Sequence, residues 1–135
     1  MRQQKQLRER IEERIADMSG NVFLRADFAD LGSYSQIGRA LAILISKRQL
    51  LRVSQGVYVR TYISPYTGEV FPIKGLATLS EALERLGIET GMTRMQRDNY
   101  EGRSTQVPTG RVVGVKKPTR RKIGYGSFLL GFELI

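Results

Sequence analysis

The side chains of this sequence that can do chemistry are mainly cations, and their chemistry is the binding of phosphate rather than catalysis. The chain has 135 residues, with 22 Lys and Arg against 13 Asp and Glu, and a formal net charge of +9. It contains no histidine and no cysteine, so the commonest general base and the imidazole and thiolate metal ligands are absent. The acidic residues form no obvious cluster. We therefore expect a binding protein that is not an enzyme, with no cofactor and no metal, whose surface attracts polyanions.

The first group of candidate binding residues belongs to a helix that we expect over residues 35–48 and to the segments beside it. Apolar side chains recur on one face of this helix, and the opposite face is small or polar, with Arg39 as its one long cation. Arg39 is the best candidate for reading DNA bases, because a guanidinium can bond to O6 and N7 of guanine together. The whole group comprises Ser33, Tyr34, Ser35, Gln36, Arg39, Lys47, Arg48, Arg52, Gln55 and Arg60.

The roles expected within this group differ. Ser33 or Ser35 can cap the helix by accepting a bond from a backbone N–H. Ser35 and Gln36 are expected to read neighbouring bases or to hold a phosphate near the helix N-terminus. Contacts to the DNA backbone are expected from Tyr34, Lys47 and Arg48, and contacts to phosphate or to the minor groove from Arg52, Gln55 and Arg60.

A second group of cations lies near the end of the chain. Residues 103–122 contain seven Lys and Arg and no acidic residue. We interpret residues 116–122 as a basic hairpin or loop that makes a second phosphate contact, with an ordinary solvated loop as the alternative. The residues proposed for this contact are Arg111, Lys116, Lys117, Arg120, Arg121 and Lys122.

The elements that must position the first group are three helices and a hairpin. Apolar residues at helical spacing predict a first helix over residues 3–18, and a short strand is expected over residues 22–24. A second helix is expected over residues 25–31, with Gly32 supplying the positive φ that often ends a helix. The helix over residues 35–48 follows directly.

The hairpin is predicted by two runs that alternate with period two. Residues 50–53 and 57–60 flank a turn over residues 54–56 that ends in glycine, which suits a tight turn with a bulge. We expect Leu51, Val53, Val57 and Val59 to pack inward, and Arg52, Tyr58 and Arg60 to face outward.

The second half of the chain mixes helices and short strands. Aromatic, Pro and Gly residues punctuate residues 61–75, which indicates a linker or an extended crossing segment. A packing helix is expected over residues 76–86, and a shorter helix over residues 92–99 with Met92 and Met95 in the core. Strands are expected over residues 111–115, 121–124 and 128–134.

These elements predict an α+β protein with two units. A hairpin directly after an amphipathic helix is typical of the winged helix-turn-helix, which we expect over residues 1–62, followed by a small α+β unit over residues 63–135. No run approaches the roughly 18 apolar residues of a membrane span. The polar N-terminus lacks the apolar core of a signal peptide. We therefore expect a cytoplasmic protein without a membrane partner.

Three short motifs lie in order within the expected winged helix. They are DFADLGS at residues 27–33, QIGRAL at residues 36–41 and LRVSQGVY at residues 51–58. In this order they resemble the N-terminal winged helix of AbiEi-type antitoxins and related mobile-element regulators. Residues 104–108 and 120–124 are similar to the C-terminal region of the same group. The resemblance implies a repressor that binds repeats in its own promoter and, for some members, a protein that neutralises a nucleotidyltransferase toxin.

Together these observations predict a sequence-specific binder of double-stranded DNA, a repressor or autorepressor of a mobile-element or toxin–antitoxin operon. One small domain reads few base pairs, so we also expect a second copy as partner, as a dimer or as cooperating monomers. Three alternatives stay open: a protein-interaction module that neutralises a toxin, an accessory DNA-binding protein of plasmid transfer, and an RNA-binding protein. RNA binding predicts patterned aromatics on a sheet, a pattern that the six Tyr and five Phe residues do not show.

Overall fold

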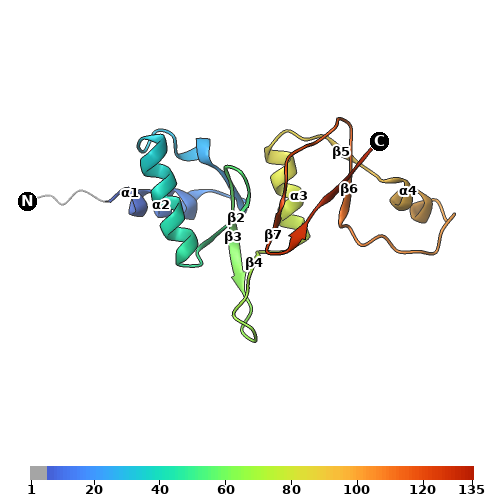
Figure 1. Cartoon of the computed structure of the whole chain (residues 1–135), viewed down its shortest axis with the longest axis horizontal. Helices are drawn as coiled ribbons and strands as arrows, with labels where there is room; N and C mark the ends of the chain where they lie inside the picture. The colour runs from blue at the N-terminus through green and yellow to red at the C-terminus, as the bar shows by residue number, and fades with distance from the viewer. Residues whose placement is uncertain (1–5) are drawn as a thin grey trace, which may run out of the picture.

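The computed structural model describes residues 6–135 and shows a mixed α+β fold, which confirms the expected fold class (Figure 1). Its helices are α1 (Leu7–Asp17), α2 (Tyr34–Ser46), α3 (Leu76–Arg85) and α4 (Arg94–Tyr100), with a short 3-10 helix, η1 (Arg25–Phe28). Its strands are β1 (Val22–Leu24), β2 (Leu50–Ser54), β3 (Val57–Ile63), β4 (Val70–Pro72), β5 (Thr90–Gly91), β6 (Val112–Val115), β7 (Gly124–Tyr125), β8 (Phe128–Leu129) and β9 (Gly131–Leu134).

A four-stranded antiparallel sheet joins the two halves of the chain. Its strand β3 pairs with β1 and β2 along its first half and with β4 along its second half. The β2–β3 turn (residues 54–56) contains Gly56 with a φ of 71°, which glycine adopts without steric cost. The register shifts between Arg52 and Ser54, as in a β-bulge. The predicted hairpin is confirmed, and it is longer than expected because β3 continues to Ile63.

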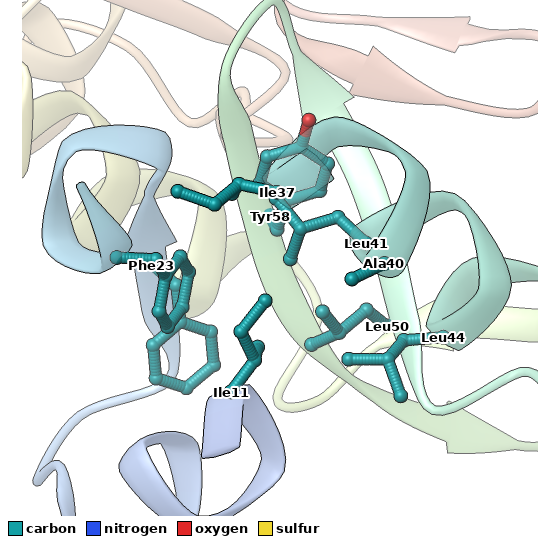
Figure 2. Close-up of a cluster of buried hydrophobic side chains, with 9 residues drawn as sticks. Ile11, Phe23, Ile37, Ala40, Leu41, Leu44, Leu50 and Tyr58 are labelled. Carbon is teal, nitrogen blue, oxygen red and sulfur yellow. The ribbon is translucent and has the colours of Figure 1, made fainter. Parts of the chain in front are cut away.

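One face of this sheet packs against α1 and α2. The core on this side is built from side chains of both helices, η1 and the strands, and Figure 2 shows how most of them converge. Phe23 of β1 and Phe28 of η1 lie with their ring centroids 6.5 Å apart. The members of this core are Ile11, Phe23, Phe28, Ile37, Ala40, Leu41, Leu44, Leu50 and Tyr58. Their burial orients α2 so that its polar face points away from the sheet.

The opposite face of the sheet packs against α3 and the C-terminal strands. The second core comprises Val22, Val53, Val57, Val59, Leu79, Ala82, Leu83, Ile123 and Leu130. Figure 1 shows α1 and α2 on one side of the β2–β3 hairpin and α3 on the other. Because both faces are covered, the expectation that Tyr58 faces outward is wrong: its side chain is only 5% exposed and belongs to the first core.

Arg60 also departs from the expected outward orientation. Its guanidinium donates to the carbonyls of Ile15 (2.6 Å), Met18 (2.9 Å) and Gly20 (3.1 Å), and it lies 4.9 Å from the centroid of the Phe23 ring. The last carbonyls of a helix lack intrahelical partners, so a cation that reaches them is stabilising. Arg60 therefore caps the end of α1 instead of facing outward.

Two N-terminal details also differ from expectation. Residues 3–5, at the expected start of the first helix, lie outside the described residues, and α1 begins at Leu7. The α-helix expected over residues 25–31 is wrong, because only η1 forms. A single turn suffices to bury Phe28: the N–H of Ala29 donates to the Ala26 carbonyl (3.2 Å) at the end of η1, and the N–H of Leu31 donates to the Phe28 carbonyl (2.9 Å) in the turn that follows. Gly32 therefore ends no α-helix, and it does not have a positive φ.

The second half shows three further corrections. Residues 61–75 are no linker, since β3 and β4 form a second hairpin there, in which Pro72 ends an edge strand that tolerates its missing N–H. Met92 and Met95 are 41% and 44% exposed rather than buried: α4, which contains Met95, buries none of its residues, and Met92 lies before the start of this helix. Strand structure near residue 121 is limited to β7, and residues 128–134 split into β8 and β9 where Leu130 turns into the second core.

Glu81 of α3 connects the two halves through main-chain hydrogen bonds. Its Oε2 accepts the N–H groups of Asn21 (2.8 Å) and Val22 (3.1 Å) at the start of β1. Replacing Glu81 by alanine leaves two partly buried donors without this acceptor, so we expect a loss of about 1–3 kcal/mol in the free energy of unfolding. Urea titration followed by circular dichroism measures it. Glu84→Ala, at an exposed position of the same helix, is the control and should change stability by less than about 0.5 kcal/mol.

Candidate nucleic-acid interface

The exposed face of α2 carries Arg39 and Ser35, two of the three residues that were expected to read bases, whereas the side chain of the third, Gln36, takes part in the cap of the helix. Ser35, Arg39, Ala42 and Ser46 are all exposed, opposite the buried apolar side of the helix. Ser33 is the N-cap: its Oγ accepts the N–H of Gln36 (3.1 Å), and Gln36 Oε1 accepts the N–H of Ser33 (3.0 Å). Arg39 makes no hydrogen bond or ion pair with any residue in the range 6–135. Its guanidinium is therefore available for a ligand.

Arg25 of η1 lies against the N-terminal half of α2 and was not identified from the sequence. Its guanidinium lies 3.6 Å from the centroid of the Tyr34 ring and donates to the Tyr34 carbonyl (2.6 Å). A Cβ on Gly38 would collide with Arg25 Nη2, so this glycine makes room for the arginine across the helix. A glycine inside a helix costs roughly 0.5–1 kcal/mol relative to alanine. A glycine inside the predicted helix, Gly38, is thus the sequence signal that could have indicated this close approach to α2.

The β2–β3 turn lies between Arg25 and the C-terminal basic segment. On one side, the carbonyl of Gly56 accepts the backbone N–H of Arg25 (3.1 Å). On the other side, Arg121 Nη1 donates to the carbonyl of Gln55 (2.8 Å) and to Ser54 Oγ (3.3 Å). Three segments that are far apart in the sequence therefore meet at this turn: the start of α2 with η1, the hairpin, and residues 120–122.

An open groove of about 800 Å³ lies where the hairpin meets the C-terminal strands. Four cations line it, with polar and apolar groups between them, and no acidic residue does. Its lining residues are Arg52, Val53, Ser54, Gln55, Arg120, Arg121, Lys122, Gly124, Tyr125, Gly126 and Leu129. The structure thus brings one cation of the first predicted group, Arg52, and three cations of the second group, at residues 120–122, into one site.

The second group of predicted cations is divided by this groove. Arg120, Arg121 and Lys122 line it, whereas Arg111, Lys116 and Lys117 do not. The guanidinium of Arg111 lies 5.7 Å from the Phe128 ring centroid. Lys116 lies beside Gly91, and Lys117 borders a separate pocket with residues 87–89. Residues 116–122 form a loop between β6 and β7. A loop was one of the two forms predicted for this segment, the other being a hairpin.

Lys47 and Arg48 lie at the other end of α2, beside the β3–β4 hairpin. Arg48 Nη1 donates to the carbonyl of Gly68 (3.3 Å), and Thr61 Oγ1 donates to the carbonyl of Arg48 (2.8 Å). Both cations are exposed. Lys47 and Arg48 therefore lie at the C-terminal end of α2, whereas Arg25 lies at its N-terminal end. The exposed face of α2 thus has cations at both ends.

The charges around this face are unbalanced. Residues 31–68 contain five Lys and Arg and no Asp or Glu. The ion pairs found within residues 6–135 use other arginines, among them Arg85 with Asp27 (2.7 Å) and Arg103 with Asp98 (3.0 Å). Arg14 pairs with Asp30, and its hydrogen bonds hold the pKa of that carboxyl below its ordinary value. Within residues 6–135, the cations of segment 31–68 thus form no ion pair with an acidic side chain, although Arg48 and Arg60 donate to carbonyl oxygens.

Within residues 6–135, no group of three or more Asp and Glu side chains is placed to hold a metal ion. No helix in this part of the chain has the length and apolarity needed to cross a membrane.

Comparison with known proteins identifies a family but no function. No curated protein and no solved structure matches the chain. Residues 10–133 match DUF6088, a family of unknown function, and this match covers nearly the whole chain. The protein therefore belongs to the DUF6088 family.

Proposed function

We propose that this protein binds double-stranded DNA in a sequence-specific manner and acts as a transcriptional regulator, with α2 as the helix that enters the major groove. The observation that carries the proposal is the exposed α2 face, on which Arg39 makes no hydrogen bond or ion pair with residues 6–135 and Ser35, Ala42 and Ser46 are small. Tyr34 and Ile43, which are 72% and 41% exposed, are the larger apolar side chains of the same helix surface. A major groove is wide enough to admit an α-helix, and such a face meets base edges without a bulky obstruction. An arginine there distinguishes guanine by a bidentate contact.

The order of elements supports a winged helix-turn-helix as the fold of the first half. Helix α1, strand β1, the turn η1, helix α2 and the β2–β3 hairpin follow one another as in that motif. In this proposal α2 is the recognition helix and the β2–β3 hairpin is the wing, which touches phosphate through Arg52 and Gln55. Arg25 joins the interface beside Tyr34, and Arg60 is left out because it caps α1.

The resemblance to AbiEi-type antitoxins and mobile-element regulators suggests the biological setting. A protein of that kind represses its own promoter from repeated half-sites, so a second copy of this chain would bind beside the first. Such a regulator acts in the cytoplasm, where the DNA is.

The proposal is tested by selecting bound duplexes from a random library at a stated salt concentration. We expect a short motif to be enriched over successive rounds. The selected duplex should bind at least about 1,000-fold more tightly than a random one at physiological salt, as is usual for specific regulators. A library that stays random, together with equal affinities for all duplexes, contradicts sequence-specific binding.

Arg52 is expected to contribute affinity without specificity. Because a phosphate contact is the same for every sequence, Arg52→Ala should weaken binding to selected and random duplexes by the same factor. Fluorescence anisotropy titrations at several salt concentrations should show the slope of log K against log salt reduced by about 0.9. Arg97→Ala, which removes one exposed charge from α4, is the control and should leave the slope unchanged. A loss confined to the selected duplex contradicts the phosphate role.

A protein-interaction module is the second candidate, and one observation favours it. Apolar side chains are exposed at the far end of the C-terminal half, where Met92, Met95, Leu134 and Ile135 are 41%, 44%, 61% and 38% exposed. The partner in this case is a toxin or a second copy of the chain. A gene for a nucleotidyltransferase-like protein beside this one favours the toxin, and sedimentation over a range of concentrations tests self-association.

A further inference from the structure

We propose that the groove between the β2–β3 turn and residues 120–126 holds the phosphate backbone of a DNA duplex, next to the segment that α2 reads. This inference rests on the proposed function and extends it, because it assigns a second binding site to a surface that α2 does not form. The ligand chemistry is that of phosphodiester oxygens. The groove is large enough, at about 800 Å³, to take more than one phosphate group.

The charge in the groove is concentrated and available. Arg52, Arg120, Arg121 and Lys122 converge there from two segments that lie more than 60 residues apart in the sequence. Arg120 and Lys122 make no hydrogen bond or ion pair with any described residue, and Arg52 bonds only to the carbonyl of Ser54 (3.4 Å). Arginine and lysine that are not already paired are the usual ligands of phosphate oxygens.

The loop that supplies these cations is held in place at both sides. Arg121 anchors it to the β2–β3 turn through Ser54 Oγ and the Gln55 carbonyl. Directly after Lys122, the side chain of Ile123 is 0% exposed in the second core. At Gly124 an added Cβ would collide with the backbone carbonyl oxygen of Phe128. A site fixed in this way loses little conformational freedom when a ligand binds.

The composition of the groove favours a backbone over a single strand with stacked bases. Tyr125 is the aromatic residue in its lining, and its ring is already engaged with Phe71 (centroids 6.0 Å apart) and Phe128 (5.6 Å). Single-stranded nucleic acids are usually bound through free aromatic faces on which bases stack. A groove with four cations and an occupied ring therefore suits phosphates.

The position of the groove makes it continuous with the α2 face. The turn that borders it bonds to Arg25 on its other side, and Arg25 in turn contacts Tyr34 at the start of α2. A duplex that receives α2 in its major groove thus has its flanking strand next to residues 120–122. This arrangement extends the footprint along one strand, away from the cations at the C-terminal end of α2.

The test compares two variants that lose the same charge from the two halves of the 116–122 loop. Arg120→Ala/Lys122→Ala empties the groove of two cations but keeps the Arg121 anchor, and Lys116→Ala/Lys117→Ala is the matched control outside the groove. Both are titrated with mixed-sequence duplexes of roughly 10 and roughly 20 base pairs, about one and two helical turns, over a range of salt. Thermal melting verifies that each variant is folded.

With the longer duplex, we expect the groove variant to lower the salt slope by about two units and the control variant by less than about half a unit. With the shorter duplex, the groove variant and the control variant should have the same salt slope. Equal slopes for both variants on both duplexes overturn the inference. A nucleoside triphosphate serves as a separate probe of free phosphates. If the groove variant loses binding of this nucleotide but keeps the wild-type salt slope for the duplexes, the groove binds free phosphates and the inference is overturned.

The experiment distinguishes a failure of base reading by α2 from a failure of phosphate binding in the groove. If Arg39→Ala leaves sequence preference intact while the groove variant lowers the slope, base reading by α2 is wrong and the groove is upheld. If Arg39→Ala relaxes the preference and the groove variant behaves like its control, only the groove is wrong.

Discussion

Replacing Arg39 by alanine is expected to lower the affinity for the selected duplex about 5- to 150-fold, which corresponds to about 1–3 kcal/mol. Arg39 is exposed and makes no hydrogen bond or ion pair with the described residues, so its removal breaks no such bond among residues 6–135. The loss should therefore come from the lost contact to a base. Binding of random duplexes should weaken only by the effect of one charge, and selection with the variant should show one position of the motif relaxed.

Arg39→Lys separates charge from base reading. Lysine keeps the positive charge but lacks the planar fork that bonds to two guanine atoms together. We expect this variant to bind random duplexes like the wild type and to lose most of that part of the preference for the selected duplex which Arg39→Ala removes. Equal losses for selected and random DNA in both Arg39 variants contradict its assignment to base reading.

Replacing Phe23 by alanine is expected to destabilise the protein by about 3–5 kcal/mol. Phe23 is 0% exposed at the centre of the first core, where it contacts Phe28 and lies under the guanidinium of Arg60. The substitution removes a large side chain, leaves a cavity, and removes the aromatic face on which the α1 cap is placed. Urea titration gives the free energy, and a fall of ten degrees or more in Tm is expected, at about 4–8 °C per kcal/mol for a small domain.

Leu129→Ala is a suitable control for the Phe23 variant. Leu129 is 58% exposed, so its truncation should cost less than about 1 kcal/mol. A loss below about 1 kcal/mol for Phe23→Ala as well contradicts the view that the first core holds α2 in its orientation.

The local elements of the first half could be predicted because their patterns are local. The period of apolar residues in α2 and the alternation around Gly56 each appear within a few turns of chain, and both elements formed close to the expected bounds. Ser33 was one of two candidate caps, and the structure selects it because its Oγ reaches the N–H of Gln36.

The orientation of the hairpin could not be predicted, because its partners are distant in the sequence. Alternation separates Tyr58 and Arg60 from Val57 and Val59, but it cannot show that both faces are covered. The second face of the sheet is covered by α3 and Ile123, which follow much later in the chain. The β3–β4 hairpin was missed for a related reason: Pro65, Gly68 and Pro72 are typical of a linker, and the pairing with β3 is a tertiary contact.

The candidate site was predicted in part. Arg39 and Arg52 are exposed as expected, whereas Arg60 is committed to α1 and Arg25 was overlooked. The sequence alone does not distinguish which of the six cations of the second group lie together on the surface. Only the hydrogen bonds of Arg121 to the β2–β3 turn show which part of the loop faces the groove.

The central claim is that the exposed face of α2, the β2–β3 turn and residues 120–122 form one surface for duplex DNA. It is tested most directly by recording the backbone amide proton–nitrogen NMR spectrum while a duplex of roughly 20 base pairs is added. We predict that the largest shifts fall on residues 34–46, 52–56 and 120–124, with little change in α4. Shifts confined to α4 and the C-terminal strands, or no shifts at any duplex concentration, contradict the account.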